Sequence, residues 1–294
     1  MTDIKELVIV SGKGGTGKTS LAGALTSLFK DKVIADCDVD AANLHIIITP
    51  KEVISQKEFI GSKKARINSD RCTQCDVCRD VCRYGAISKE YIIDPVLCEG
   101  CGACYFLCPA KAIDFTPQLA GYCYICRTPS NESFVFAELL PGEENSGKLV
   151  AEVRNEAREE AKARGTELIL IDGPPGIGCP VISSLTGVNF ALIVTEPTPT
   201  GVHDLKRIVD LTRHFKIKAA LVVNKSDINP DYVGDIKKYC EDEGLIYLGE
   251  IPYDSKITEA QKNMKTILDF APNSEVSRAI KEIHKKIQKI LEEV

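Results

Sequence analysis

A glycine-rich loop near the start of the chain constrains the fold more than any other feature of the sequence. It reads GKGGTGKT from Gly12 to Thr19, after a short apolar run at residues 7–10 and before a helical pattern at residues 20–29. Glycines let successive backbone N–H groups turn toward phosphate, and a helix N-terminus adds positive potential. The order of strand, loop and helix therefore predicts a P-loop.

The loop predicts a nucleotide site with bound Mg²⁺. Lys18 is expected to reach the β- and γ-phosphates, and the Thr19 hydroxyl is expected to bind Mg²⁺. The residues expected to contact nucleotide are Gly12, Gly14, Gly15, Thr16, Gly17, Lys18, Thr19 and Ser20.

The remainder of the chain predicts an α/β fold with a mostly parallel sheet covered by helices on both faces. Apolar runs alternate with helical patterns from residue 167 to a final helix that begins near Ser274. Such alternation is typical of parallel sheets. Asp38 and Asp172 follow apolar runs, at the carboxyl ends of predicted strands, where α/β sheets place their ligand chemistry.

Composition excludes several classes of protein. A chain of 294 residues with 44% hydrophobic content can bury a core, and its net charge of −5 gives no reason to expect a nucleic-acid partner. We find neither a signal-peptide pattern nor an apolar run of transmembrane length, which predicts a cytoplasmic protein. In that reducing compartment the 13 cysteines are better interpreted as metal ligands than as disulfides.

Eight cysteines form two runs with the same spacing, C-x2-C-x2-C-x3-C. The first run is Cys72, Cys75, Cys78 and Cys82, and the second is Cys98, Cys101, Cys104 and Cys108. This spacing resembles two-cluster bacterial ferredoxins, in which three cysteines hold one cubane and the fourth reaches the other cluster. The resemblance implies one [4Fe–4S] cluster on Cys72, Cys75, Cys78 and Cys108, and a second on Cys98, Cys101, Cys104 and Cys82. Zinc is the alternative, although zinc sites seldom repeat this spacing twice.

The ferredoxin resemblance has one departure and one supporting pattern. Arg83 stands where the first run would carry proline, whereas Pro109 follows the second run. Proline only shapes the turn there, so ligation is expected to survive. Apolar residues at 86–87, 91–93 and 112–113 resemble the short strand pairs that enclose such clusters.

Lys13 indicates which class of P-loop proteins the sequence resembles. A second lysine at this place resembles the deviant Walker A motif, KGGxGKT, of the MinD/Mrp class, which is related to the nitrogenase iron protein. The resemblance implies a homodimer in which Lys13 crosses to the nucleotide of the partner subunit and acts on transition-state charge. It also implies that Asp38 orients the attacking water and that Asp172 holds Mg²⁺. A solvated loop lysine is the bland alternative for Lys13.

The nucleobase pocket has two interpretations. Residues 224–227 read NKSD, which taken alone matches the guanine-reading motif of GTPases. The family resemblance instead assigns Asn224 to adenine, with Pro252 closing the pocket. We favour ATP, with ADP as its product, because the lysine-containing loop carries more information than a four-residue match.

The resemblance narrows to MinD-superfamily P-loop ATPases that contain an inserted ferredoxin domain. It implies a discontinuous ATPase domain, residues 1–66 and 117–294, interrupted by a two-cluster ferredoxin domain at residues 67–116. Insertion at a surface connection is well tolerated.

Three further cysteines give a candidate extra metal site. Cys179 lies seven residues after Asp172, a spacing similar to that between switch aspartate and cluster ligand in the nitrogenase iron protein. Cys123 and Cys126 form a CxxC pair. Ordinary buried thiols are the alternative for each.

The apolar residues of the last helix recur at helical spacing, at Val276, Ile280, Ile283, Ile287, Ile290 and Val294. Such a stripe either covers the sheet or lies on a membrane, and the first interpretation is favoured because the helix follows the alternating pattern without a linker.

Three functional hypotheses remain. The leading one is a dimeric ATP switch that meets a protein client during iron–sulfur or other metal-cofactor assembly. The second is an ATP-gated reductase that passes electrons from the clusters to a redox partner. The third is a nucleotide-regulated scaffold or positioning factor in which the clusters are structural.

Overall fold

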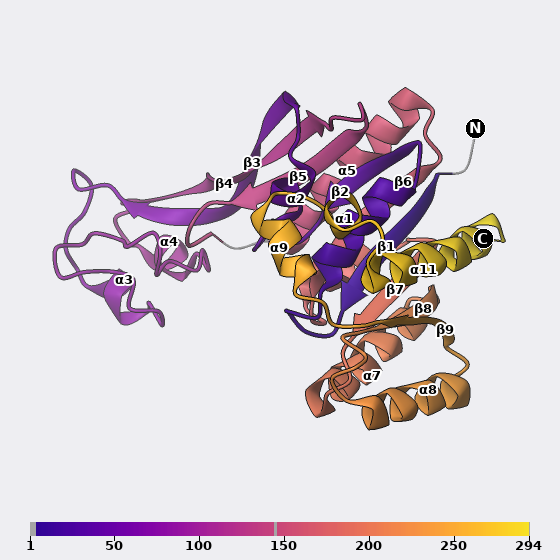
Figure 1. Ribbon diagram of the computed structural model, residues 1–294. Helices are drawn as coiled ribbons and strands as arrows, with labels where there is room; N and C mark the ends of the chain where they lie inside the picture. The colour runs from indigo at the N-terminus through magenta and orange to yellow at the C-terminus, as the bar shows by residue number, and fades with distance from the viewer. Residues whose placement is uncertain (1–3, 144–145, 294) are drawn as a thin grey trace. The chain divides into compact units, whose positions relative to one another are not determined.

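Parallel strands form the centre of the structure, a computed structural model that describes residues 4–143 and 146–293. Within those residues the sheet has the order β3-β4-β5-β2-β6-β1-β7-β8-β9 (Figure 1). The strands are β1 (Lys5–Ser11), β2 (Lys32–Asp36), β3 (Glu52–Ile67), β4 (Ile113–Arg127), β5 (Ser133–Leu139), β6 (Leu168–Pro175), β7 (Phe190–Thr195), β8 (Lys218–Asn224) and β9 (Ile246–Ile251). Every neighbouring pair from β5 to β9 is parallel, which confirms the predicted α/β fold with a mostly parallel sheet.

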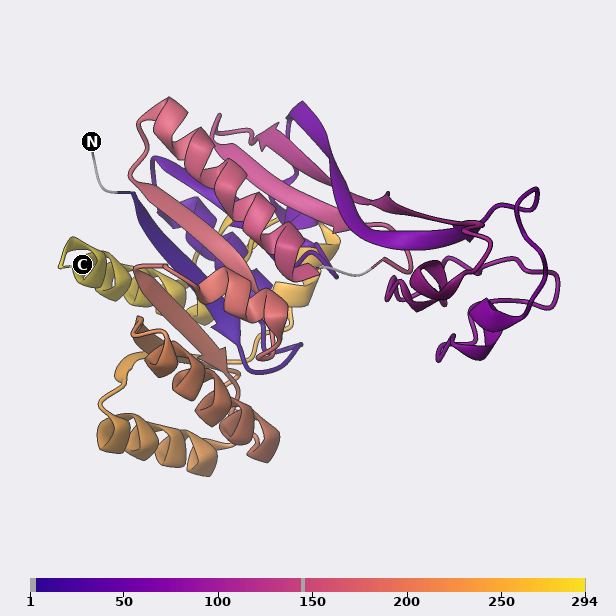
Figure 2. The same cartoon turned by 180° about the vertical axis from the view of Figure 1, so that it is seen from behind.

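Helices cover both faces of the parallel part of the sheet. Figure 1 shows α1, α9 and α11 toward the viewer, and Figure 2 shows α5, α6 and α7 on the opposite face. The helices are α1 (Lys18–Leu28), α2 (Leu44–Ile48), α3 (Val77–Asp80), α4 (Ala103–Leu107), α5 (Ser146–Arg164), α6 (Cys179–Leu185), α7 (Pro199–His214), α8 (Pro230–Glu243), α9 (Lys256–Lys262), α10 (Ile267–Phe270) and α11 (Glu275–Glu292).

The chain divides into two compact units. The larger, which we call the nucleotide unit, comprises Met1–Gln56, Cys123–Glu138 and Ser146–Val294. The smaller, the cysteine unit, comprises Lys57–Tyr122 and Leu139–Asn145. It contains the predicted insertion, residues 67–116, and extends beyond it along β3 and β4.

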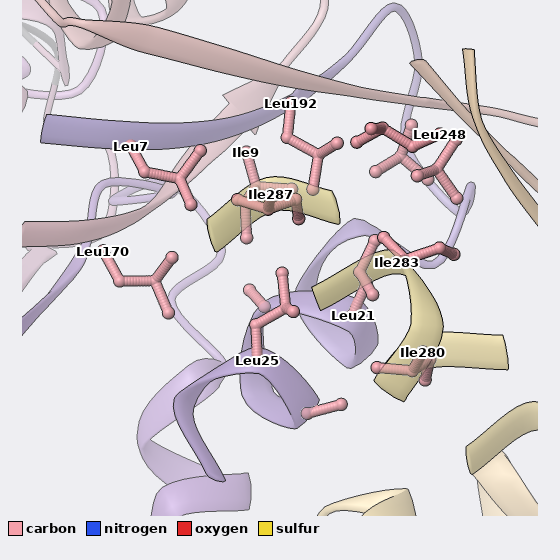
Figure 3. Packing of buried hydrophobic residues seen from close by; sticks show 14 of the residues in the cluster. Leu7, Ile9, Leu21, Leu25, Leu170, Leu192, Leu248, Ile280, Ile283 and Ile287 are labelled. Atoms are coloured by element: carbon pink, nitrogen blue, oxygen red, sulfur yellow. The ribbon is translucent and has the colours of Figure 1, made fainter. Parts of the chain in front are cut away.

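The core of the nucleotide unit lies between the sheet and helices α1 and α11 (Figure 3). Leu7 and Ile9 of β1 point toward Leu25 of α1 and Ile287 of α11, and none of the four side chains is exposed. Alternation along β1 sends Val8 and Val10 to the other face.

The apolar stripe of α11 is part of this core. Val276, Ile280, Ile283 and Ile287 are buried in it, and Ile290 packs against it. The helix therefore covers the sheet, as the favoured interpretation of its sequence predicts; Val294 lies outside the described residues. Among the described residues, no helix is both long and apolar enough to span a bilayer.

A small apolar cluster forms the interior of the cysteine unit. Ala65, Cys78, Ile87 and Ile113 are buried there, and Cys82, Cys98, Cys104 and Cys108 pack against them. Of the short strand pairs expected from the sequence, the structure shows one isolated antiparallel bridge between Ile87 and Ile93, and a backbone hydrogen bond from Asn68 N to Ala112 O at 2.7 Å.

Replacement of Ile287 by alanine tests the role of α11. We expect the free energy of unfolding to fall by about 2–5 kcal/mol, because the change leaves a cavity beneath α1 and the sheet. Urea unfolding of the purified protein gives the measurement, with Gln288→Ala on the exposed side of the same helix as the control. Equal stability of the two variants would contradict the packing of α11 on the core.

His284 makes the stability sensitive to acid. Its ring packs edge-on against Phe29 with centroids 4.4 Å apart, its Nε2 is buried without a hydrogen-bond partner among the described residues, and burial lowers the pKa of the imidazole. Below its ordinary pKa of about 6.5 the unfolded chain binds a proton that the folded chain resists, so stability falls as the pH drops through that value.

We expect His284→Phe to lose less stability than the wild type between pH 7 and pH 5.5, by up to about 1 kcal/mol. Urea midpoints at each pH measure the difference. His203→Gln, at an exposed histidine, is the control and should follow the wild type. If His284→Phe keeps the full acid sensitivity, the buried imidazole is not its source.

Candidate nucleotide site and cysteine cavity

The glycine loop forms a tight turn between β1 and α1. Gly17 has φ +89° and precedes the first residue of α1, so the loop N–H groups and the helix N-terminus share one location. A Cβ at Gly17 would lie 2.2 Å from Asn224 Nδ2, and one at Gly12 would lie 2.5 Å from the backbone oxygen of Asp204. Both positions therefore require glycine for steric reasons that the sequence alone did not show.

Two residues of the NKSD segment brace the loop. Asn224 Nδ2 donates to Thr16 O at 2.7 Å, and Lys225 Nζ donates to Gly15 O at 3.0 Å. Asp227 Oδ1 accepts from Tyr253 N at 2.7 Å, which ties the segment to the loop after β9. The motif thus stabilises the loop through contacts that do not depend on which base is bound.

Lys18 lies in a buried group of carboxylates. Its Nζ is 2.6 Å from Asp172 Oδ1 and 3.6 Å from Asp38 Oδ2, and the Lys18 side chain is only 6% exposed. Burial alone would lower the pKa of Lys18, but Asp172 and Asp38 favour the charged form and raise it overall. The lysine charge is therefore fixed at the end of the loop, where phosphate is expected.

Parallel pairing brings the carboxylates together. Asp36 at the end of β2 is in register with Asp172 of β6, and Asp38 follows two residues later. Asp36 accepts from the backbone N–H groups of Asp38 and Leu44 at 3.0 and 3.1 Å, so it shapes the turn that carries Asp38. Burial, with Asp172 nearby, raises the pKa of Asp36 to about 7. The sequence alone gives no indication that Asp36 shapes this turn.

Two orphaned polar atoms indicate that the site fits a metal-bound phosphate ligand. Asp172 Oδ2 and Thr16 Oγ1 are buried and have no hydrogen-bond partner among the described residues. A hard cation such as Mg²⁺ takes carboxylate and hydroxyl oxygens, and buried polar atoms are normally satisfied. The Asp172 carboxylate is therefore a suitable group to hold Mg²⁺, which would neutralise phosphate charge there. For Thr19, whose hydroxyl accepts from Lys18 Nζ at 3.3 Å, the Mg²⁺ role stays a prediction from the sequence.

The predicted nucleotide residues mostly line one cleft of about 660 Å³. Lys13, Gly12 and Asp172 do not line it: Gly12 packs on α7, Asp172 contacts Lys18, and Lys13 binds Glu196 at 2.5 Å. The predicted residues along its wall are Gly14, Gly15, Thr16, Gly17, Lys18, Thr19, Ser20, Asp38, Asn224 and Pro252.

The far end of the cleft is built by the loop after β9 and by α9. Tyr253, Ile257 and Gln261 line it beside Pro252, and Gln261 Nε2 donates to Ser20 Oγ at 2.9 Å. An apolar wall with a few polar groups suits a nucleobase. Apart from Pro252, the sequence contains no signal that marks these residues, because they lie in an ordinary loop and helix.

A second cavity lies in the cysteine unit. Cys72, Cys75, Cys78 and Cys108 line it together with Tyr91 and Ile113. The structure thus brings three cysteines of the first run to the fourth cysteine of the second. Ala112 N donates to Cys108 Sγ at 3.3 Å, a contact of the kind that tunes cluster thiolates.

Three of the other four cysteines lie around the same apolar cluster. Cys82, Cys98 and Cys104 pack against it, while Cys101 is exposed. Burial is the main cause that raises the pKa of Cys104 to about 11, and the nearby Cys98 and Cys101 add to it. Within residues 4–143 and 146–293, no three Cys, His, Asp or Glu side chains converge as on a single metal ion.

The three additional candidate cysteines are not brought together with these sets. Cys123 and Cys126 lie on β4, where a spacing of three residues points side chains to opposite faces, and Cys126 is buried beside Phe134 and Phe136. Cys179 is exposed at the start of α6. Strand parity could have separated the CxxC pair from the sequence alone.

The fold and the cleft define a P-loop nucleotide-binding protein. The family model of the CobQ/CobB/MinD/ParA nucleotide binding domain matches residues 7–267 of the sequence, so the chain belongs to that family. An uncharacterised protein of Methanocaldococcus jannaschii is 35% identical over 98% of each chain. An iron–sulfur cluster carrier protein of Aquifex aeolicus is 26% identical over 52% of this chain and 47% of its own length.

A solved structure with the same fold is the MinC:MinD cell division protein complex of Aquifex aeolicus. Its TM-score is 0.58 at 19% sequence identity, and the match covers 97% of this chain and 96% of that chain. At this identity the likeness shows the fold alone.

Gly17→Ala tests the geometry of the loop. We expect the nucleotide-free protein to lose about 1–3 kcal/mol of unfolding free energy, because alanine is strained at positive φ and its Cβ meets Asn224. Gly14→Ala is the matched control, since nothing lies within 4 Å of a Cβ there. Thermal and urea unfolding measure both variants, and equal losses would contradict the described contact.

Proposed function

We propose that this chain is an ATP-hydrolysing homodimeric switch with an inserted two-cluster ferredoxin domain, and that it acts with a protein client in iron–sulfur or other metal-cofactor assembly. The observation that carries the proposal is the presence of two sites in one chain. One is the cleft with Lys18 and its carboxylates, and the other is the cavity lined by four cysteines.

ATP hydrolysis is supported by the arrangement at the end of the loop. Asp38 lines the cleft beside Lys18, at the place where a carboxylate can orient water for attack on the γ-phosphate. Lys18 supplies a positive charge that positions the phosphates, and Asp172 would hold the Mg²⁺ that neutralises them. Hydrolysis then breaks the bond between the γ-phosphorus and its bridging oxygen, with water as the nucleophile.

Cluster binding is supported by the donor set of the cysteine unit. Thiolates are the usual ligands of [4Fe–4S] clusters. Besides Cys72, Cys75, Cys78 and Cys108, the only other polar side chains along the described wall of the cavity are the hydroxyls of Thr73 and Tyr91. When bound, the clusters would supply one-electron chemistry. The corresponding set for the second cluster is Cys98, Cys101, Cys104 and Cys82.

A role in cofactor assembly is supported by one relative. The iron–sulfur cluster carrier protein matches about half of this chain, and the MinC:MinD structure offers a precedent for a protein partner on this fold. We propose no metal role for Cys123, Cys126 or Cys179, because Cys123 and Cys126 point to opposite faces of β4 and Cys179 lies at the start of α6.

ATP-gated electron transfer is a second candidate. The observation that favours it is the exposure of Cys75 and Cys101, one from each cysteine run, so that both clusters would approach the surface. It predicts that the cluster potentials, measured by redox titration with EPR, differ between ADP, ATP and no nucleotide. Identical potentials, together with no acceptor that raises hydrolysis, would remove its support.

Lys18→Ala tests the nucleotide half of the proposal. We expect ATP hydrolysis to fall by at least about a hundredfold, because the charge that positions the phosphates is lost. Iron content should stay unchanged, since Lys18 lies in the other unit. Phosphate release measures the rate, and Lys285→Ala, at an exposed lysine, is the control. Unchanged hydrolysis in Lys18→Ala would contradict the assignment.

Iron and sulfide analysis after anaerobic purification tests the cluster half. We expect about eight irons and eight sulfides per chain, and about four of each in Cys108→Ser, which removes a ligand of the first set. Cys240→Ala is the control, because this cysteine is buried on α8 outside the cysteine unit. A wild type that binds zinc and contains no sulfide would refute the cluster assignment.

Client binding is best measured with the same anaerobic protein. Asp38→Asn is expected to bind ATP without hydrolysing it, and it should retain a client that elutes from the wild type after turnover. Retention that is equal with ATP, ADP and no nucleotide would favour the scaffold hypothesis instead.

A further inference from the structure

Glu196 lies between two lysines at the edge of the phosphate loop. Its Oε1 is 2.5 Å from Lys13 Nζ, and its Oε2 is 3.1 Å from Lys225 Nζ. Lys13 also donates to Thr200 Oγ1 at 3.0 Å. Lys13 is therefore held by groups of its own chain.

The main chain at Glu196 is closely packed. The residue directly follows β7, its carbonyl accepts from Thr198 N at 2.8 Å, and a Cβ at Gly201 would lie 2.2 Å from that carbonyl oxygen. The side chain is 13% exposed. If Lys13 moves away, the ion pair with Lys225 still holds the carboxylate beside the loop.

The ion pair between Lys13 and Glu196 is suited to exchange, in which Lys13 leaves Glu196 for another anion. The Lys13 side chain is 29% exposed, whereas that of Lys18 is 6% exposed. Burial would raise the pKa of Glu196, but hydrogen bonds from Lys13 and Lys225 lower it overall, so the carboxylate is ionised at neutral pH. Pairs at this exposure contribute modestly to stability, and a lysine in one can leave for another anion at small cost.

We propose that Glu196 is a positioning residue that holds Lys13 on its own chain in the nucleotide-free state, so that formation of the ATP-bound dimer requires Lys13 to leave it. The inference rests on the proposed homodimeric switch. Triphosphate bound to a second copy of this chain is the anion that competes with Glu196 for the lysine. Glu196 thereby sets the nucleotide concentration at which two copies associate.

Lys225 supplies the main alternative explanation. Because it bridges Glu196 and Gly15 O, loss of the carboxylate could loosen the loop without any effect through Lys13. Glu196→Gln combined with Lys13→Ala separates the two routes. If Glu196 acts through Lys13, its replacement has no further effect on dimer formation once Lys13 is absent.

The first experiment measures the contact itself. Nucleotide-free full-length wild type and Glu196→Gln are labelled with trace acetic anhydride, and mass spectrometry gives the rate at each lysine. We expect Lys13 labelling to rise about two- to fivefold in Glu196→Gln. Glu250→Gln, which removes the comparable exposed pair with Lys237, is the control and should leave Lys13 unchanged. An unchanged Lys13 rate in Glu196→Gln overturns the inference.

The second experiment measures association. Sedimentation velocity with increasing ATP, in the Asp38→Asn background, gives the midpoint of dimer formation, which we expect at about two- to fivefold lower ATP for Glu196→Gln. If the Asp38→Asn protein with Glu196 intact dimerises at the same ATP midpoint as the protein that also carries Glu196→Gln, the inference about Glu196 is overturned and the proposed switch is not. If neither protein dimerises at saturating ATP, the proposed homodimeric switch is wrong. The inferred role of Glu196 in dimer formation is then wrong as well, whatever the labelling shows.

Discussion

The buried ion pair between Lys18 and Asp172 is the interaction on which the nucleotide unit depends. A buried charge without a partner costs several kcal/mol, so each side chain requires the other in the nucleotide-free state. The pair forms because β1 and β6 are parallel neighbours with Ile9 opposite Asp172, and the loop after β1 carries Lys18. The pairing of β2 with β6 adds Asp36 opposite Asp172, with Asp38 just beyond. The order of the strands and the geometry of the turns after them therefore determine the phosphate site together. When phosphate binds, its negative charge has to replace part of the electrostatic stabilisation that Asp172 gives to Lys18.

The elements of the nucleotide unit could be predicted because their signals are local. The loop and its flanking strand and helix lie within a short segment, and the alternating apolar runs after residue 167 correspond to strands and helices of the structure. The role of Glu196 could not be predicted in this way. Its partner Lys13 lies almost two hundred residues away, and no pattern around Glu196 marks it as anything other than a loop acid. Asp36 was overlooked for a related reason, because its hydrogen bonds to Asp38 and Leu44 depend on a turn that only the structure defines.

The cysteine unit raises a different question, because its interior is small. Only four residues of its apolar cluster are fully buried, and one of them is Cys78. Several large side chains of the unit, including Phe106 at 77% exposure, stay on the surface. Units of this size seldom bury enough apolar surface to be stable alone and are commonly reinforced by metal centres. If both clusters bind as proposed, their binding free energy is part of the folding free energy of the unit. A purely structural role and a redox role for the clusters are then compatible, and stability alone does not separate them.

The two lysines of the loop differ in a way that follows from their surroundings. Lys18 is surrounded by buried carboxylates that cannot be left unpaired, so it stays in its own subunit whatever the nucleotide state. Lys13 is part of a more exposed pair, and the carboxylate it would leave still has Lys225 as a partner. Loss of Lys13 therefore does not strand a buried charge, which lowers the cost of its departure. A residue that must change partners between states needs this kind of redundancy, and Glu196 provides it by binding two lysines at once.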